Sequence, residues 1–150
     1  MDLILWRHAE AEEGDRDLQR KLTSKGRKQA ERVAGWLLAR LPTKFLVLAS
    51  PARRALETAH ALGVPVRTVD GLAPGASVQT ILDAADWPER KGAVVVSGHQ
   101  PDLGRAVAYL VAGSAADWSI KKGGLWWLNT RERDGKSQVV VRAVLNPDLL

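Results

Sequence analysis

The chain has 150 residues, of which 45% are hydrophobic and 26% are charged, as is ordinary for one folded domain covering residues 1–150. Cysteine is absent, which excludes disulfides, thiolate nucleophiles and zinc sites built on cysteine. No stretch approaches the ~20 apolar residues that cross a bilayer, and no secretory signal is recognisable. We therefore expect a cytoplasmic protein with no membrane contact.

The formal net charge is +5, from 22 basic and 17 acidic side chains. Such a balance suits nucleic acid, acidic proteins or phosphorylated substrates as partners. No base-reading motif is present, and one Phe and one Tyr offer little stacking surface, so nucleic acid is not the expected partner. For the basic run between residues 16 and 32 we favour a solvated helix face over a docking patch: Arg16, Arg20, Lys21, Lys25, Arg27, Lys28 and Arg32.

The first elements in chain order are a strand, a loop and a helix. Leu3 to Trp6 is too short an apolar run for a helix and is rich in strand formers, which predicts a buried parallel strand. Residues 9–22 are polar and predict a loop. Thr23 or Ser24 can then cap a helix that ends before Pro42. Its apolar stripe has helical spacing: Ala30, Val33, Ala34, Leu37, Leu38 and Leu41.

A second strand is expected at 44–49. Ser50 and Pro51 after it predict a new helix, with a capping hydroxyl and then proline in the first helical position. The remaining expected elements are a short strand near 64–69, a helix near 76–86, a strand at 93–97, a helix from about 102, and strands at 123–129 and 137–145 joined by a turn at 132–136. Together they predict a three-layer α/β/α sandwich with a mostly parallel central sheet and an antiparallel edge hairpin.

Cationic and imidazole side chains follow three of these strands. Arg7 and His8 follow the first, Arg54 lies in the first turn of the helix after the second, and His99 follows the strand at 93–97. Ligands bind at the carboxyl ends of strands in open α/β sheets, so we expect these side chains to meet at one edge. Each could instead belong to an ordinary surface pair or turn, but their common position favours one convergent site. His60 lacks such a position and is expected to be structural.

This set of residues suits a phosphoryl group. A neutral imidazole at His8 can attack phosphorus without a separate base and forms a phosphoramidate that water can cleave. Arg7 and Arg54 carry planar forks that match phosphate oxygens, and a protonated His99 would add another donor. The backbone N–H groups of the helix starts after residues 50 and 100 are expected to point at the same place.

Three motifs also resemble signatures of the histidine phosphatase superfamily, which has the phosphoglycerate-mutase-like fold: Arg7-His8-Ala9, the stretch 50–59, and the stretch 98–101. The compact length and the stretches 20–26, 72–75 and 121–124 resemble its short bacterial branch, the SixA-type phosphohistidine phosphatases. The resemblance spans residues 3 to about 128. It implies that His8 is phosphorylated during turnover, that Arg7, Arg54 and His99 form the phosphate pocket, and that Arg20 adds a phosphate contact. It also implies that no metal or other cofactor is used.

The sequence departs from the superfamily pattern in two places. Ala9 replaces the usual glycine after the histidine, and its methyl group could narrow the pocket. The long insertion that carries a glutamate acid in the mutase branch is missing, which leaves Glu10 and Asp17 as nearby candidate proton donors. A phosphohistidine substrate needs such an acid less, because imidazole leaves more readily than a sugar alkoxide. An open rim also suits a phosphate carried by a protein.

We therefore predict a metal-independent phosphatase that acts on phosphohistidine in a signalling or phosphorelay protein. Two alternatives stay open: a general phosphatase for small phosphorylated metabolites, and a phosphate- or phosphoprotein-binding module with little turnover. The six tryptophans could form a recognition surface, but we favour core and edge packing for them.

Overall fold

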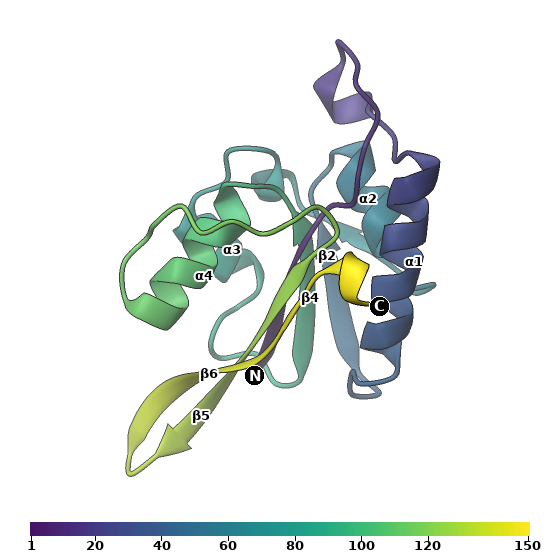
Figure 1. Ribbon diagram of the computed structural model, residues 1–150. Coiled ribbons are helices and arrows are strands. Elements are labelled where there is room, and N and C mark those ends of the chain that lie inside the picture. Colours follow the sequence, from purple (N-terminus) through teal and green to yellow (C-terminus); the bar gives the residue numbers. More distant parts are fainter.

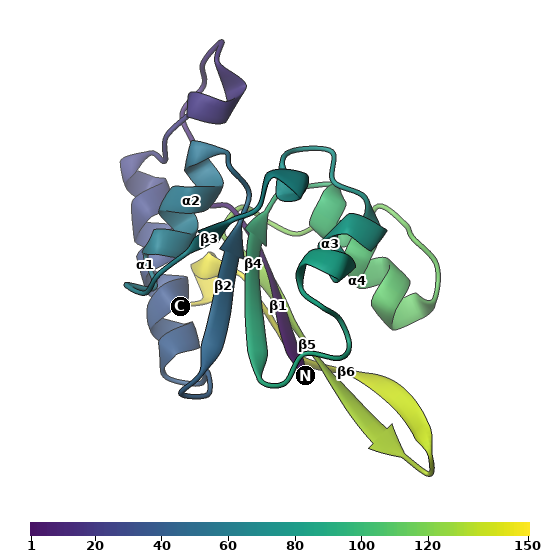
Figure 2. The ribbon, with the colours of Figure 1, turned by 180° about the vertical axis from the view of Figure 1, so that it is seen from behind.

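The computed structural model describes residues 1–150 as a six-stranded sheet with helices on both faces (Figures 1 and 2). The strands are β1 (Asp2–Arg7), β2 (Phe45–Ala49), β3 (Arg67–Thr68), β4 (Ala93–Gly98), β5 (Leu125–Arg133) and β6 (Lys136–Leu145). The helices are α1 (Ser24–Leu38), α2 (Arg53–His60), α3 (Val78–Ala84) and α4 (Asp102–Ala112), with short 3-10 helices at Asp17–Gln19, Asp70–Leu72 and Pro147–Leu149. None of the helices combines the length and the apolar character that a membrane-spanning segment needs.

The strand order β3-β2-β4-β1-β5-β6 confirms the predicted architecture. β1, β2, β3 and β4 run parallel, whereas β5 is antiparallel to β1 and β6 is antiparallel to β5. In this register Arg7 lies opposite Gly98, and Ala49 lies opposite Ser97. The carboxyl ends of β1, β2 and β4 are therefore level with one another, which places the residues that follow them at one edge.

Two apolar layers hold the sheet between its helices. Successive side chains of a strand point to opposite faces, so Ile4 and Trp6 pack in the layer beneath α1 and α2, while Leu3 and Leu5 pack in the layer beneath α3 and α4. All six tryptophans are buried or half-buried, which confirms their expected packing role.

Of the two residues predicted to cap α1, Thr23 is the one that does so. Thr23 Oγ1 accepts a hydrogen bond from the backbone N–H of Gly26 at 2.9 Å. A side chain at Gly26 would overlap the backbone oxygen of Glu10, so the glycine lets α1 lie against the segment after β1. The predicted buried stripe was wrong at Leu38, whose side chain is 45% exposed, because it lies at the edge of the face that Ala30, Val33, Ala34 and Leu37 bury.

The start of α2 differs from the prediction. α2 begins at Arg53 after Ala52, and no side chain caps it. Ser50 Oγ instead accepts a hydrogen bond from the N–H of Ala52 at 3.1 Å and lies 2.7 Å from Nε2 of His99. The Ser50 hydroxyl thus belongs to the functional edge, and the Ala52 N–H is not free for a ligand.

The β5–β6 hairpin extends beyond the helical layers (Figure 1). Its turn is shorter than predicted, because Asp134 and Gly135 alone connect the strands with φ angles of 52° and 73°. β6 is an edge strand, and three of its valines are exposed: Val139, Val141 and Val144.

Candidate active site

The predicted residues converge at the carboxyl end of the sheet. A cavity of about 480 Å³ opens there. Its lining includes the predicted nucleophile and phosphate-pocket residues Arg7, His8, Arg54 and His99. It also includes Arg20 and Asp17, but not Glu10. The full lining is Arg7, His8, Ala11, Glu13, Gly14, Asp17, Arg20, Arg54, Pro74, His99, Gln100 and Lys122.

His8 is held in one orientation and one tautomer. Its backbone N–H donates to the oxygen of Gly98, and its own oxygen accepts from the N–H of Gly123, both at 3.0 Å. Its Nδ1 lies 2.7 Å from the backbone oxygen of Ala9, which can only accept, so Nδ1 carries the proton. Nε2 therefore has a lone pair, which accepts a hydrogen bond from Nε of Arg54 at 3.3 Å.

The charge state of His8 follows from its surroundings. Burial, together with the positive charges of Arg54, Arg7 and Arg20, lowers its pKa from 6.5 to about 4, although the hydrogen bond to Ala9 acts in the opposite direction. At neutral pH the ring is uncharged, with its lone pair at the cavity, which is the state a nucleophile requires.

Arg54 connects both histidines to the loop before α1. Its side chain is only 4% exposed. Besides the bond to His8, Nη1 donates to the backbone oxygen of Asp17 at 2.7 Å, and Nη2 donates to the Asp17 carboxylate at 3.2 Å. Nη2 also lies 3.4 Å from Nδ1 of His99. A single guanidinium thus places positive charge at the centre of the cavity floor.

His99 lies beside His8, with 5.3 Å between the ring centroids. A guanidinium only donates, so Nδ1 of His99 is the acceptor toward Arg54, and Nε2–H donates to the Ser50 hydroxyl at 2.7 Å. Burial, with added repulsion from His8 and Arg54, lowers the pKa of His99 to about 3. The ring is therefore neutral while the cavity holds no anion.

Arg7 lines the same cavity. Its Nη1 donates to the backbone oxygen of Ile120 at 2.7 Å, which fixes the direction of the side chain. Its Nε is buried without a hydrogen-bond partner.

The predicted extra phosphate contact, Arg20, and the candidate proton donors, Asp17 and Glu10, lie in different places. Arg20 lines the cavity, and its Nε and Nη2 donate to Oδ1 of Asp17 at 3.2 and 3.0 Å. Desolvation alone would raise the pKa of Asp17, but hydrogen bonds from Arg54 and Arg20 outweigh it and lower the pKa. Glu10 lies outside the cavity, where its carboxylate accepts a hydrogen bond from Thr23 Oγ1 at 2.8 Å. The exposed His60 also lies outside it.

The methyl group of Ala9 does not narrow the cavity, contrary to our expectation. Ala9 is fully buried in the layer beneath α1 and α2 and is absent from the cavity lining. Its backbone N–H donates to the buried hydroxyl of Thr58 at 3.0 Å, and that hydroxyl donates to the backbone oxygen of Arg54 at 2.7 Å. Sequence reasoning missed Thr58, although its position four residues after Arg54 on the buried side of α2 was a usable signal.

Two further residues at this edge were missed as well. Gln100 bridges the backbone oxygen of Trp118 and the N–H of Gly104, both at 2.8 Å, and so joins the segment before β5 to α4. Lys122 adds a cation to the cavity lining. Across the chain, no three side chains of the His, Asp or Glu type gather closely enough to hold a metal ion.

Comparison with known proteins decides the family. The sequence profile of the histidine phosphatase superfamily (branch 1) matches residues 3–74, which include Arg7, His8 and Arg54. The uncharacterized protein Rv1276c of Mycobacterium tuberculosis is 31% identical over 121 residues, which are 76% of this chain and 75% of the relative. The chain belongs to the histidine phosphatase superfamily.

Solved structures resemble this chain over nearly its whole length. A candidate SixA phosphohistidine phosphatase from Nakamurella multipartitia is 28% identical with a TM-score of 0.81, and the match covers 97% of this chain and 95% of that one. A protein histidine phosphatase SixA solved with tungstate is 24% identical with a TM-score of 0.84, and the match covers 99% of each chain. The chain therefore has a SixA-like fold, as the sequence motifs predicted.

Proposed function

We propose that this protein hydrolyses phosphohistidine in proteins through a phosphoryl group held transiently on His8, without a metal ion. The observation that carries the proposal is the state of His8. It is a buried, neutral imidazole whose Nε2 lone pair lies in a cavity beside the Arg54 guanidinium.

The proposed reaction has two displacements at phosphorus. In the first, Nε2 of His8 forms a bond to phosphorus while the bond to the substrate nitrogen breaks. The substrate imidazole, which already carries a proton on its other ring nitrogen, departs as a neutral ring. In the second, water attacks phospho-His8, which releases inorganic phosphate and restores the neutral ring. The positive charge that develops on the ring is stabilised by the Nδ1–H bond to the oxygen of Ala9.

The cationic side chains would bind the phosphoryl oxygens throughout. Arg54 lies beside both histidines, and Arg7 has a buried Nε without a partner. Donors fixed in advance around the reacting group commonly contribute the largest share of catalysis. A bound phosphoryl dianion would also raise the pKa of His99, because opposite charges favour the protonated ring, so His99 would become a further donor.

Phosphohistidine is the substrate that best fits the carboxylate in contact with Arg54, which is that of Asp17. Asp17 has a lowered pKa and two arginine partners, so it is ionised at neutral pH and is a poor proton donor. A departing imidazole needs less acid assistance than an alkoxide does. A sugar phosphate would depend much more on a strong acid, and the favoured substrate is accordingly the phosphoramidate.

The phosphoryl intermediate can be trapped directly. Brief incubation with radiolabelled phosphoramidate followed by denaturation should leave label on the protein that is stable in alkali and lost in acid. His8→Ala should take up no label, whereas His60→Ala, which alters an exposed histidine outside the cavity, should be labelled like the wild type. A wild-type protein that takes up no label and turns over no phosphate ester would instead be a binding module.

The substrate class is tested by kcat/KM. We expect a phosphohistidine peptide to be hydrolysed with a much higher kcat/KM than a sugar phosphate. Equal values for the two compounds would contradict the phosphohistidine assignment and would favour a general phosphatase for small metabolites.

A further inference from the structure

Two more hollows continue from the active-site cavity along α1. The first, of about 420 Å³, shares Arg7 and Lys122 with the active-site cavity. The second, of about 270 Å³, shares Lys25 and Gln29 with the first. We call the two together the basic groove. Its cationic side chains are Arg7, Lys25, Lys28, Arg32, Lys121 and Lys122.

The basic groove carries unbalanced positive charge. Its only carboxylates are those of Glu10, which accepts a hydrogen bond from Thr23, and Asp148, which lies 3.9 Å from Lys121. The ion pairs of the structure include neither Lys122 nor any of the three cations on α1. These cations are exposed, so a long anionic ligand could reach several of them at once.

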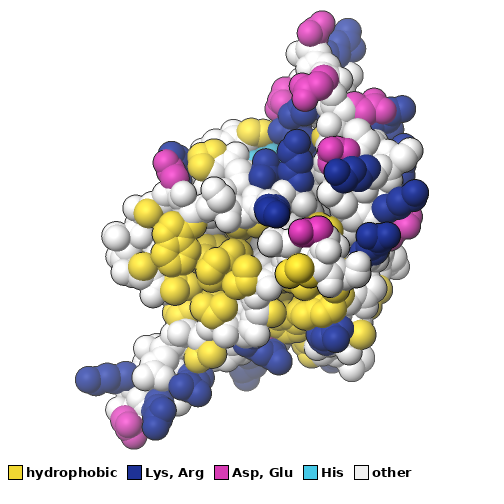
Figure 3. All heavy atoms as spheres, in the orientation of Figure 1, with side chains coloured by type: hydrophobic (Ala, Val, Ile, Leu, Met, Phe, Trp, Pro, Cys, Tyr) yellow, Lys and Arg dark blue, Asp and Glu magenta, His cyan; other side chains and the backbone are white.

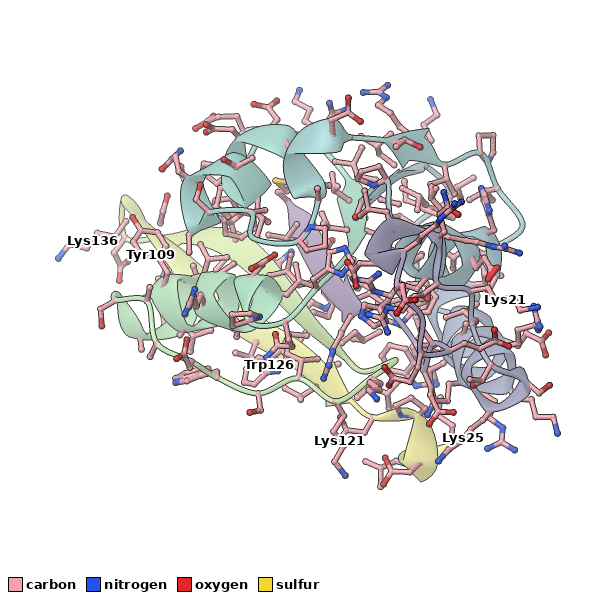
Figure 4. All side chains as sticks on the ribbon, turned by 90° about the horizontal axis from the view of Figure 1, so that it is seen from above. Lys21, Lys25, Tyr109, Lys121, Trp126 and Lys136 are labelled. Carbon is pink, nitrogen blue, oxygen red and sulfur yellow. The ribbon has the colours of Figure 1, made fainter.

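The fold places these cations in one row. Lys25, Lys28 and Arg32 are spaced three and four residues apart, so they share one face of α1. Figure 4 shows Lys25 and Lys121 on the two sides of the C-terminal 3-10 helix, and Figure 3 shows basic side chains gathered on the α1 side of the molecule. The floor is held by Gln29, whose Oε1 accepts from the N–H of Glu10 at 3.0 Å.

We propose that the basic groove binds an acidic segment of the phosphoprotein substrate while the phosphoryl group lies in the active-site cavity. The inference rests on the proposed function and specifies the charge of the substrate surface beside the phosphorylated residue. Protein is favoured over nucleic acid because no aromatic side chain lines the groove, so bases would have nothing to stack on. The basic run that we had interpreted as a solvated helix face is then partly one wall of this groove.

Charge reversal tests the groove without altering the active-site cavity. The triple variant Lys25→Glu, Lys28→Glu, Arg32→Glu changes three exposed residues that do not line that cavity. The matched control makes the same change of charge at the exposed end of the β5–β6 hairpin: Arg131→Glu, Arg133→Glu and Lys136→Glu. The probes are two peptides with one phosphohistidine each, flanked by glutamates in one and by glutamines in the other.

We expect the wild type and the hairpin control to hydrolyse the glutamate peptide with the higher kcat/KM. The groove variant should lose about tenfold or more on that peptide, because attraction becomes repulsion at three sites. Its kcat/KM on p-nitrophenyl phosphate should stay within about twofold of the wild-type value, since this small ester does not extend beyond the active-site cavity. Raised salt should weaken the preference in the wild type.

A binding measurement separates failure of the groove from failure of the enzyme. Fluorescence anisotropy of a labelled polyglutamate peptide needs no turnover, and we expect binding to the wild type that the groove variant loses. If His8 takes up no radioactive phosphoryl group in the trapping experiment, the proposed function is overturned, but the anisotropy measurement can still be interpreted. Equal kcat/KM for the two phosphopeptides, or polyglutamate binding that survives charge reversal, would overturn the groove. Tighter binding of single-stranded DNA of equal charge would overturn the choice of protein as occupant.

Discussion

Thr58 offers a sharp test of how the nucleophile is positioned. Its hydroxyl accepts from the N–H of Ala9 at 3.0 Å and donates to the oxygen of Arg54 at 2.7 Å, and the side chain is fully buried. Thr58→Val keeps the branched shape but removes both hydrogen bonds. The N–H of Ala9, also fully buried, then has no acceptor.

The expected cost follows from that unpaired N–H. A buried donor without a partner destabilises a protein by about 1–3 kcal/mol, so we expect the free energy of unfolding to fall by about 2 kcal/mol. The oxygen of Ala9 also accepts from Nδ1 of His8, so a shift of this peptide would turn the ring. A small misplacement of a reacting group is costly, and kcat should fall about tenfold or more.

Urea unfolding followed by tryptophan fluorescence gives the free energy, and p-nitrophenyl phosphate hydrolysis gives kcat. Thr58→Ser is the control, because it keeps the hydroxyl and loses only a methyl group. It should retain most of the activity. A Thr58→Val protein with wild-type kcat and a free energy within about 0.5 kcal/mol of the wild type would refute the reasoning.

Three further predictions concern charge and packing around the same site. Arg54→Lys should lower kcat about 100-fold or more, because one ammonium group cannot reach both imidazoles and Asp17. An unchanged kcat for p-nitrophenyl phosphate would show that Arg54 takes no part in the reaction. The pKa values of His8 and His99 fall from 6.5 to about 4 and about 3, so below pH 6.5 the unfolded chain binds protons that the folded protein does not. The free energy of unfolding should therefore drop by about 2 kcal/mol per histidine between pH 7 and pH 5, and urea midpoints that do not change with pH would contradict this. Gly26→Ala should lower the free energy of unfolding by about 1–3 kcal/mol in the same urea assay, because the Cβ of alanine would meet the backbone oxygen of Glu10. An unchanged free energy of unfolding would contradict this close contact between α1 and the segment after β1.

The convergent site could be predicted because its signals are local. Arg7 and His8, and later His99, each follow a short apolar strand, and parallel strands joined by helices bring their carboxyl ends to one edge. Arg54 was found for the same reason, as a residue of the first turn after β2. Strand direction and helix position were enough to bring these four side chains to one cavity.

The rest depends on contacts between distant parts of the chain. Ser50 before Pro51 carries an ordinary capping signal, but a buried imidazole 49 residues away takes its hydroxyl. The shortest contact of the loop with Arg54 is made by the backbone oxygen of Asp17, and a backbone atom leaves no signal in the sequence. Glu10 is near His8 in sequence, yet its carboxylate is bound by Thr23 on another side.

The exposed β6 strand has a consequence for behaviour in concentrated solution. An outer strand that carries Val139, Val141 and Val144 on its surface is the kind of edge on which molecules can add strand to strand. Lys136 places positive charge on the same strand, and like charges repel when two copies approach edge to edge, whereas the charge of Arg142 is paired with Asp2 at 3.0 Å. Lys136 should therefore disfavour self-association of the hairpin, although the same charge would attract an acidic strand of another protein.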